Sequence, residues 1–402
     1  MAEVKRGWVV LVLVLVVALL VAACAPVSTT VKKKTVEIVD IAPLTGPIAH
    51  SEQIVLQAAQ DYIRYFNEEG VIPEVTVELT WIDTGRQLSN AISAYRRSIE
   101  RGVFLILTDS TAPISTFTPW CEKDEVVLFA LYPGKIAVYP PGWAYCPVST
   151  FGETAASVID YLMANWEEER PPRLAFMGPD QEFGIEPAEQ GTRYAEGIGI
   201  EVLPMEFIPF VTLDATPQLL RLTERGVDFV YINGLVVAVG PILRDAERLG
   251  LLNDVRFGGC EYSGGDALIN MTGSACEGYL FPRAFPWYDD TEVPGIALIL
   301  NNQIKYHDEV IREPEYTGAW VITAIACEAI RRAMEDVGYE NLNGRAVKAA
   351  LDNMKDFDVY GLGMVSYGPE DRRGCSKAAA YQIKDGKIIR ASEWGETPVL
   401  VP

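Results

Sequence analysis

The fold is decided most clearly by residues 103–130, which read VFLILTDSTAPISTFTPWCEKDEVVLFA. Val103–Leu107 and Val126–Ala130 are short, unbroken apolar runs, and between them Ile114–Glu122 has the apolar spacing of a helix. Unbroken apolar strands are typical of parallel sheets, because helices cover both faces of such sheets. A strand, a helix and a second strand in this order therefore predict a parallel sheet of an α/β fold.

The same alternation extends to both sides of this stretch. Upstream, the pattern predicts strands over Val36–Ala42 and Val75–Ile82 and helices over Ser51–Phe66 and Ala91–Glu100. The alternation starts again after Pro140-Pro141-Gly142. There it predicts the helices Gly152–Trp166, Pro187–Gly197, Thr216–Arg225 and Val239–Leu249 and the strands Leu174–Met177, Val202–Ile208, Asp228–Ile232 and Val255–Gly258. The sequence therefore predicts two doubly wound parallel-sheet lobes.

A third section follows the second run of alternation. It carries the amphipathic helices Ile296–Ile311 and Thr317–Val337 and a shorter helix, Gly344–Met354. Near the end, Lys384-Asp385-Gly386-Lys387 predicts the tight turn of a β-hairpin, because Asp-Gly tolerates the positive φ angles that such turns require. We expect this section to add to both lobes, with the chain crossing between them more than once.

The N-terminus has the pattern of a secretory signal. Lys5 and Arg6 precede an apolar run from Trp8 to Ala23, which ends in Val21-Ala22-Ala23-Cys24. A transmembrane anchor is the alternative, but the run is shorter than the roughly 20 residues that a span needs. The small residues before Cys24 resemble a bacterial lipobox. We therefore expect a signal peptide over 1–23, a lipidated Cys24 with a tether over 24–35, and a body outside the cytoplasm, anchored to the cell membrane through that lipid alone.

Composition limits the partners and the chemistry. The chain has 49% hydrophobic residues, enough for a large core, and a formal net charge of -21, which repels nucleic acid and anionic membranes. The sequence contains no P-loop, zinc-protease, nucleophile-elbow or EF-hand motif and only two histidines. We therefore expect no metal, no cofactor and no enzymatic activity.

Six cysteines remain when Cys24 is set aside. In an oxidising compartment an even number is consistent with disulfides, and proximity in the sequence suggests the pairs 121–146, 260–276 and 327–375. Free buried thiols are the alternative. The residues concerned are Cys121, Cys146, Cys260, Cys276, Cys327 and Cys375.

Polar and aromatic residues follow several of the predicted strands. In doubly wound sheets ligands bind beyond the carboxyl ends of the strands. Hydroxyls and amides that open a helix suit an anion such as a carboxylate, an acid suits an ammonium, and aromatic rings suit an apolar body. Ordinary helix caps are the alternative for any one of these positions. The candidates are Thr108, Asp109, Ser110, Leu131, Tyr132, Phe183, Asn233, Glu261 and Tyr262.

Taken together, these features resemble the type I periplasmic binding proteins, and in particular the branched-chain amino-acid-binding receptors of ABC importers. The resemblance covers Glu37 to about Ser392 and depends on the order and spacing of several weak motifs. These motifs are Pro43-Leu44-Thr45-Gly46-Pro47, Asp180-x-x-Phe183-Gly184, Asp228-Phe229-Val230-Tyr231, the Gly240…Ala246…Gly250-Leu251 helix and Gln382-Ile383-Lys384-Asp385-Gly386-Lys387.

The resemblance implies a set of ligand contacts. The family's carboxylate-binding hydroxyl falls on Thr108, beside Asp109 and Ser110, and its next contact segment falls on Ala130, Leu131 and Tyr132. Its ammonium-binding acid falls on Glu261, and the usual tyrosine before Gly184 is Phe183 here. An aromatic contact in the first loop aligns near His50-Ser51.

The resemblance also implies an architecture and a mechanism. It places lobe 1 at 36–149 plus 285–358 and lobe 2 at 150–284 plus 359–395, joined by a multi-strand hinge. A small ligand such as an amino acid first meets Thr108 and Ser110, and closure then brings Phe183, Asn233 and Glu261 over it. We expect a monomer that delivers its ligand to an ABC permease. A ligand-presenting sensor, or a receptor for amides, urea or aromatic acids, is the alternative.

Overall fold

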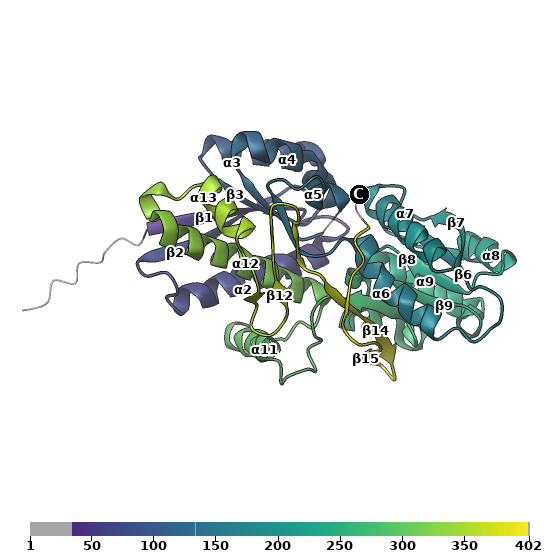
Figure 1. The fold of residues 1–402 in the computed structure, drawn as a ribbon. Coiled ribbons are helices and arrows are strands. Elements are labelled where there is room, and N and C mark those ends of the chain that lie inside the picture. The colour runs from purple at the N-terminus through teal and green to yellow at the C-terminus, as the bar shows by residue number, and fades with distance from the viewer. Residues whose placement is uncertain (1–33, 133, 401–402) are drawn as a thin grey trace, which may run out of the picture.

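The computed structural model describes residues 34–132 and 134–400, and they form two α/β lobes (Figure 1). The predicted signal peptide over 1–23, the lipidated Cys24 and the tether up to residue 33 lie outside the described residues. Among the helices that are described, none is both long and apolar enough to cross a membrane.

Lobe 1 is built on a six-stranded, fully parallel sheet in the order β13-β5-β4-β3-β1-β2. Its strands are β1 (Lys34–Ala42), β2 (Val75–Asp83), β3 (Leu105–Thr108), β4 (Val127–Ala130), β5 (Ala144–Val148) and β13 (Arg373–Cys375). In Figure 1, α3 and α4 lie on one side of this sheet and α2 and α12 on the other, so its apolar strands are covered on both faces. The helices of this lobe are α2 (Ala49–Glu68), α3 (Leu88–Glu100), α4 (Thr111–Asp124), α5 (Lys135–Val138), α11 (Pro294–Tyr306), α12 (Pro314–Val337) and α13 (Gly344–Asp352).

Lobe 2 is built on a second sheet, which runs in the order β15-β14-β10-β9-β8-β6-β7. Its strands are β6 (Arg173–Gly178), β7 (Glu201–Phe207), β8 (Phe229–Ile232), β9 (Arg256–Gly259), β10 (Leu280–Arg283), β14 (Lys377–Lys384) and β15 (Lys387–Arg390). The first five are parallel, whereas β14 pairs antiparallel with β10, and β15 pairs antiparallel with β14. The helices are α6 (Phe151–Ala164), α7 (Glu182–Gly197), α8 (Thr216–Glu224), α9 (Val236–Arg248) and α10 (Asp266–Thr272).

Most of the predicted elements are confirmed, with ends that shift by a few residues. The hairpin is confirmed as well: Lys384 pairs with Lys387, and Asp385 and Gly386 have φ angles of 52° and 67°, as a two-residue turn requires. Strands β5 and β10 were not predicted. Each is only four or five residues long and contains a proline, Pro147 or Pro282, so neither shows an apolar or alternating run long enough to be recognised.

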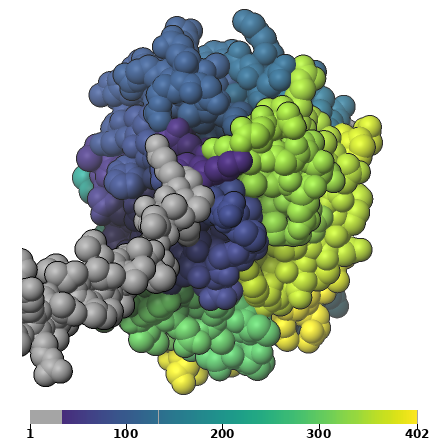
Figure 2. All heavy atoms as spheres, turned by 90° about the vertical axis from the view of Figure 1, so that its left-hand side faces the viewer, coloured from purple at the N-terminus to yellow at the C-terminus, as the bar shows by residue number. Residues whose placement is uncertain are grey.

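Strand pairing corrects the expected division of the chain. Residues 373–375, which the sequence analysis places in lobe 2, pair with β5 in the first sheet. The chain crosses between the lobes three times, after Val148, after Arg283 and after Cys375. Lobe 1 therefore joins N-terminal and C-terminal segments, which lie side by side on the surface that Figure 2 shows in purple-blue and in green-yellow.

The proposed disulfide pairs are wrong. All six cysteines of the described chain are free and buried: Cys121, Cys146, Cys260, Cys276, Cys327 and Cys375. Their thiols fill the core, and several donate to nearby backbone carbonyls, as Cys121 does to Phe117 at 3.2 Å and Cys260 to Gly234 at 3.4 Å. Proximity in the sequence failed as a guide because it does not set the distance between two sulfur atoms once their elements pack, as for Cys327 in α12 and Cys375 in β13.

Candidate ligand-binding site

A cavity of about 350 Å³ lies between the two lobes. Lobe 1 contributes the start of α2, the loop from β2 into α3 and the loop from β3 into α4, and lobe 2 contributes the loops that follow β6, β7 and β8. These loops meet here because they follow the carboxyl ends of parallel strands, where ligand sites of doubly wound sheets form. The volume suits a small organic molecule.

Three carboxyl groups of lobe 1 form the buried side of this site. Asp40 comes from β1, Glu52 from α2 and Asp109 from the end of β3, and all three side chains are fully buried. Glu52 and Asp109 border the cavity, and Asp40 lies behind them. None of the carboxyl oxygens of Asp40 and Glu52, nor Oδ2 of Asp109, has a hydrogen-bond partner among the described residues.

The crowding of these acids changes their titration. Burial raises the pKa of Asp40 and Glu52 well above the ordinary carboxyl value, and the nearby charge of Asp109 raises both further. Burial also raises the pKa of Asp109. At the start of α12, burial raises the pKa of Glu315 to about 7. Such a cluster holds fewer negative charges than it has carboxyls, and a positive charge placed beside it would be strongly stabilised.

Aromatic rings enclose the rest of the cavity. Tyr132 of lobe 1 faces Phe183 and Phe210 of lobe 2 across it, and Tyr262 packs behind Tyr132 with its ring centroid 4.6 Å away. The hydroxyl of Tyr132 is buried and has no hydrogen-bond partner among the described residues. The cavity wall thus combines apolar surface with a few unpaired polar atoms.

Arg86 is the one cationic residue in the lining of the cavity that the structure describes. It belongs to the loop after β2, and its guanidinium lies 3.6 Å from the centroid of the Phe210 ring, a cation–π contact between the two lobes. Burial lowers its pKa, an effect that the charge of Glu52 opposes. An arginine keeps its charge despite such a shift, so the cavity lining contains one positive charge as well as acids.

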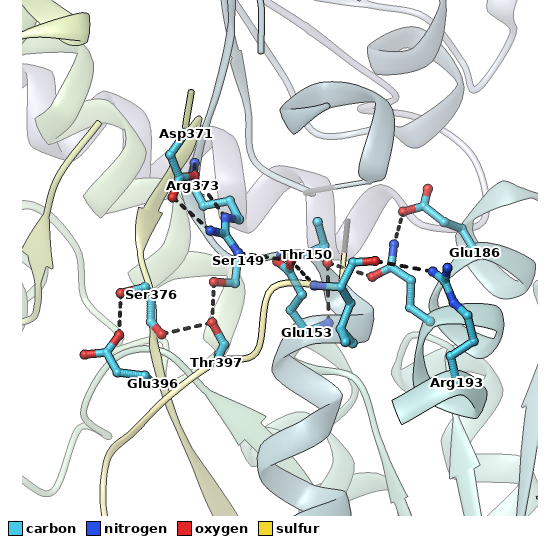
Figure 3. Close-up of polar contacts among 12 residues, drawn as sticks. Ser149, Thr150, Glu153, Glu186, Arg193, Asp371, Arg373, Ser376, Glu396 and Thr397 are labelled. Atoms are coloured by element: carbon cyan, nitrogen blue, oxygen red, sulfur yellow. Dashed lines mark hydrogen bonds and ion pairs between the residues drawn. The ribbon is translucent and has the colours of Figure 1, made fainter. Parts of the chain in front are cut away.

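The crossings between the lobes are held by a polar network (Figure 3). Arg373 of β13 pairs with Asp371 at 2.8 Å and with Glu153 of α6 at 3.0 Å, and Glu153 also caps its own helix through Thr150. Ser149 Oγ lies 2.7 Å from Thr397 Oγ1. These contacts tie a strand of lobe 1 to the first turn of a helix in lobe 2.

Comparison with known proteins identifies the family. The family model described as a periplasmic binding protein matches residues 35–387. The chain belongs to the periplasmic binding protein family. The leucine-, isoleucine-, valine-, threonine- and alanine-binding protein of Pseudomonas aeruginosa is 26% identical over 64% of this chain and 69% of its own length. The leucine-specific-binding protein of Salmonella typhimurium is 24% identical over 82% and 85%.

Solved structures agree on the fold. A branched-chain amino acid ABC transporter from Thermus thermophilus, crystallised with bound valine, superposes with a TM-score of 0.83 at 23% identity. The match covers 92% of this chain and 98% of that one. The expected type I fold with two parallel-sheet lobes is therefore confirmed.

In this periplasmic binding protein, four of the residues proposed from the sequence border the cavity: Asp109, Ser110, Tyr132 and Phe183. Ser110 precedes the first turn of α4, and its hydroxyl lies 3.4 Å from Asp109 Oδ1. Their contact with a ligand remains a prediction.

Other proposed residues are occupied by contacts within the protein. The Thr108 hydroxyl donates to the carbonyl of Ile41 at 2.8 Å, and the amide of Asn233 donates to the carbonyl of Phe183. Glu261 lies 3.3 Å from Arg283, and both side chains are buried. Glu261, the predicted ammonium-binding acid, therefore already has a positively charged partner within the protein, Arg283.

The remaining proposed residues lie outside the cavity lining. Ala130 and Leu131 are fully buried at the end of β4, and Tyr262 lies behind Tyr132. Ser51 does not line the cavity, and its side chain opposes the rise in the pKa of Glu315. These residues therefore do not form part of the cavity wall.

Sequence reasoning missed Glu52, Arg86 and Phe210. Arg86 follows the carboxyl end of β2, in Asp83-Thr84-Gly85-Arg86, which is the same kind of position that singled out Thr108 and Glu261. The end of that strand therefore carried a usable signal. Glu52 carried none, because an acid in the first turn of a helix is common for reasons unrelated to binding.

Proposed function

We propose that this protein is the substrate-binding component of an ABC importer and that it captures an α-amino acid with an apolar side chain. The observation that carries the proposal is the cavity between the lobes, with a cation, a group of acids and three aromatic rings around it. An α-amino acid has the complementary parts, namely a carboxylate, an ammonium and an apolar side chain. The names of the relatives, which bind leucine, isoleucine and valine, support the same class.

In this proposal the lobes act in sequence. The ligand first meets lobe 1, where its carboxylate faces Arg86 and the first turn of α4, whose free backbone N–H groups favour an anion. Rotation about the three crossings then brings Phe183 and Phe210 against its side chain. Exclusion of water strengthens the charged hydrogen bonds, each contributing about 1.5–3 kcal/mol.

Delivery completes the proposed role. The closed form, tethered to the membrane through a lipid on Cys24, would present the ligand to a permease as a monomer. The protein itself would carry out no chemistry, as expected of a receptor.

A thermal-shift screen of the purified protein tests the proposal. The panel contains L-amino acids with their D-enantiomers as matched controls, together with amides, urea and aromatic acids. A ligand at 100 times its Kd adds about 2.7 kcal/mol of stability, so a true ligand raises Tm clearly. We expect stabilisation by apolar L-amino acids and none by their D-forms. Stabilisation confined to compounds without an amino group would contradict the amino-acid proposal.

A further inference from the structure

The acids that border the cavity are poised to accept hydrogen bonds that the protein does not supply. Glu52 and Asp109 are fully buried, and three of their four carboxyl oxygens lack a hydrogen-bond partner among the described residues. Unpaired buried carboxyls cost free energy, and a folded protein tolerates them where a ligand completes the site.

Tyr132 provides an independent observation at the same place. Its side chain is 5% exposed and borders the cavity, yet its hydroxyl has no partner in the part of the chain that the structure describes. Tyr132 lines the same cavity as Glu52 and Asp109. Three groups from three elements, each with an unpaired oxygen, therefore border one cavity, and a primary ammonium has three N–H donors.

Two other occupants fit less well. The side chains of the described residues include no group of three that could hold a metal ion, so these carboxyls do not converge as metal ligands do. Arg86 stacks on Phe210 and forms no ion pair within 4 Å of Glu52 or Asp109 among the described contacts. An organic cation is therefore the better complement of the cluster.

Glu261 is poorly suited to the same role. Its carboxylate lies 3.3 Å from the guanidinium of Arg283, and Arg283 is fully buried. A ligand ammonium brought to Glu261 would meet this second positive charge in a medium that screens it weakly. Glu261 also does not border the cavity.

From this geometry we propose that Glu52, Asp109 and Tyr132 on lobe 1 hold the primary ammonium of the ligand, and that Glu261 does not. The inference rests on the proposed function and adds the orientation of the ligand. The ammonium lies against α2 and β3, the carboxylate lies toward Arg86, and the polar ends are both bound before lobe 2 closes. Selectivity for an amine over a hydroxyl then resides in lobe 1.

The test compares each amino acid with the acid in which a hydroxyl replaces the amino group. Isothermal titration calorimetry is carried out with L-leucine, L-valine and L-phenylalanine and with the three corresponding L-2-hydroxy acids. The wild-type protein should bind at least one amino acid about 100-fold more tightly than its hydroxy acid. Glu52→Gln and Asp109→Asn should each weaken amino-acid binding about tenfold or more while changing hydroxy-acid binding little. Tyr132→Phe should act in the same direction with a smaller loss.

Glu261→Gln is the matched control and should keep the wild-type ratio between amino acid and hydroxy acid. Because that variant leaves Arg283 unpaired, the double variant Glu261→Gln/Arg283→Gln accompanies it, and circular dichroism verifies folding. Unchanged ratios in Glu52→Gln and Asp109→Asn would overturn the inference and leave the proposed function intact. A wild-type protein that binds none of the amino acids, or binds the hydroxy acids equally well, would overturn both.

Discussion

Two groups of buried carboxyls in this protein have opposite surroundings. Glu153, at the crossing between the lobes, accepts from Arg373 at 3.0 Å, from the Leu400 amide at 3.0 Å and from the Thr150 amide at 2.9 Å (Figure 3). Glu52 at the cavity and Asp40 behind it are buried to the same extent and accept a hydrogen bond from no group of the described chain. Burial alone therefore does not tell a structural acid from a binding acid, whereas the count of satisfied oxygens does.

The contrast has a physical basis. A carboxylate whose hydrogen bonds are all supplied by the protein has nothing left to offer a ligand, and its removal leaves its partners unpaired. A carboxylate whose hydrogen bonds are missing destabilises the protein until something supplies them. The two groups should consequently respond in opposite directions when their charge is removed.

The largest expected effect is at the crossing. Glu153→Gln should lower the free energy of unfolding by about 3 kcal/mol, because the buried guanidinium of Arg373 loses half of its charge compensation and an NH2 group replaces one of two oxygens that accept from N–H donors. Urea denaturation measures the change. Glu189→Gln, on an exposed position of the neighbouring helix α7, is the control and should change stability little. If Glu153→Gln lowered the free energy of unfolding no more than Glu189→Gln does, the proposed difference between the two groups of buried carboxyls would be wrong.

The acids with raised pKa values predict the pH dependence of the protein without ligand. The pKa of Asp40, Glu52 and Asp109 lies above the ordinary carboxyl value, and those of Glu186 and Glu315 are raised to about 7. Between the unfolded and folded values the folded state binds more protons, so stability falls as the pH rises through this window. The groups that face Glu52 are Asp40, Asp109, Glu315, Tyr132 and Arg86.

Acidification from pH 8 to pH 5 should therefore raise the free energy of unfolding by about 2 kcal/mol. Denaturation curves at intermediate pH values measure it, at constant ionic strength. Stability that instead increases steadily from pH 5 to pH 8 would contradict the assignment of uncompensated acids to this site.

The smallest effect concerns Asp40, which lies behind the cavity. Asp40→Asn should stabilise the protein by about 1 kcal/mol at pH 8, because it removes an unpaired charge and supplies a donor toward Asp109. Asp308→Asn, an exposed substitution in the loop after α11, should have no measurable effect. The gain at Asp40 should shrink at pH 5, and destabilisation at both pH values would show that Asp40 has a partner in solution.

The fold could be predicted because its main determinants are local. Apolar runs such as Val103–Leu107 and amphipathic spacing in α2 mark a parallel sheet with helices on both faces, whatever the ligand. The short strands β5, β10 and β13 were among the elements not predicted, because only pairing with their neighbours makes them recognisable. Residues 373–375 were consequently placed in lobe 2, whereas β13 pairs with β5 in lobe 1.

The candidate site was predictable only in part. The ends of β3 and β4 were identified correctly as positions near a cavity, and Asp109, Ser110 and Tyr132 lie there. The partner of Glu261 could not be anticipated, because Arg283 lies in the undetected strand β10. Glu52 enters the site through the packing of α2 on lobe 1, a tertiary effect with no counterpart in its local sequence.

The six buried thiols have a consequence for how the protein is made. Since no covalent link joins the elements of the described chain, its body requires no oxidising step and no disulfide isomerase to reach the native state. Expression in a reducing cytoplasm should yield the same fold as secretion. The thiols also allow global unfolding to be measured. A maleimide can react with Cys327 in the centre of α12 only when the lobe unfolds, so the rate of labelling reports how often this happens.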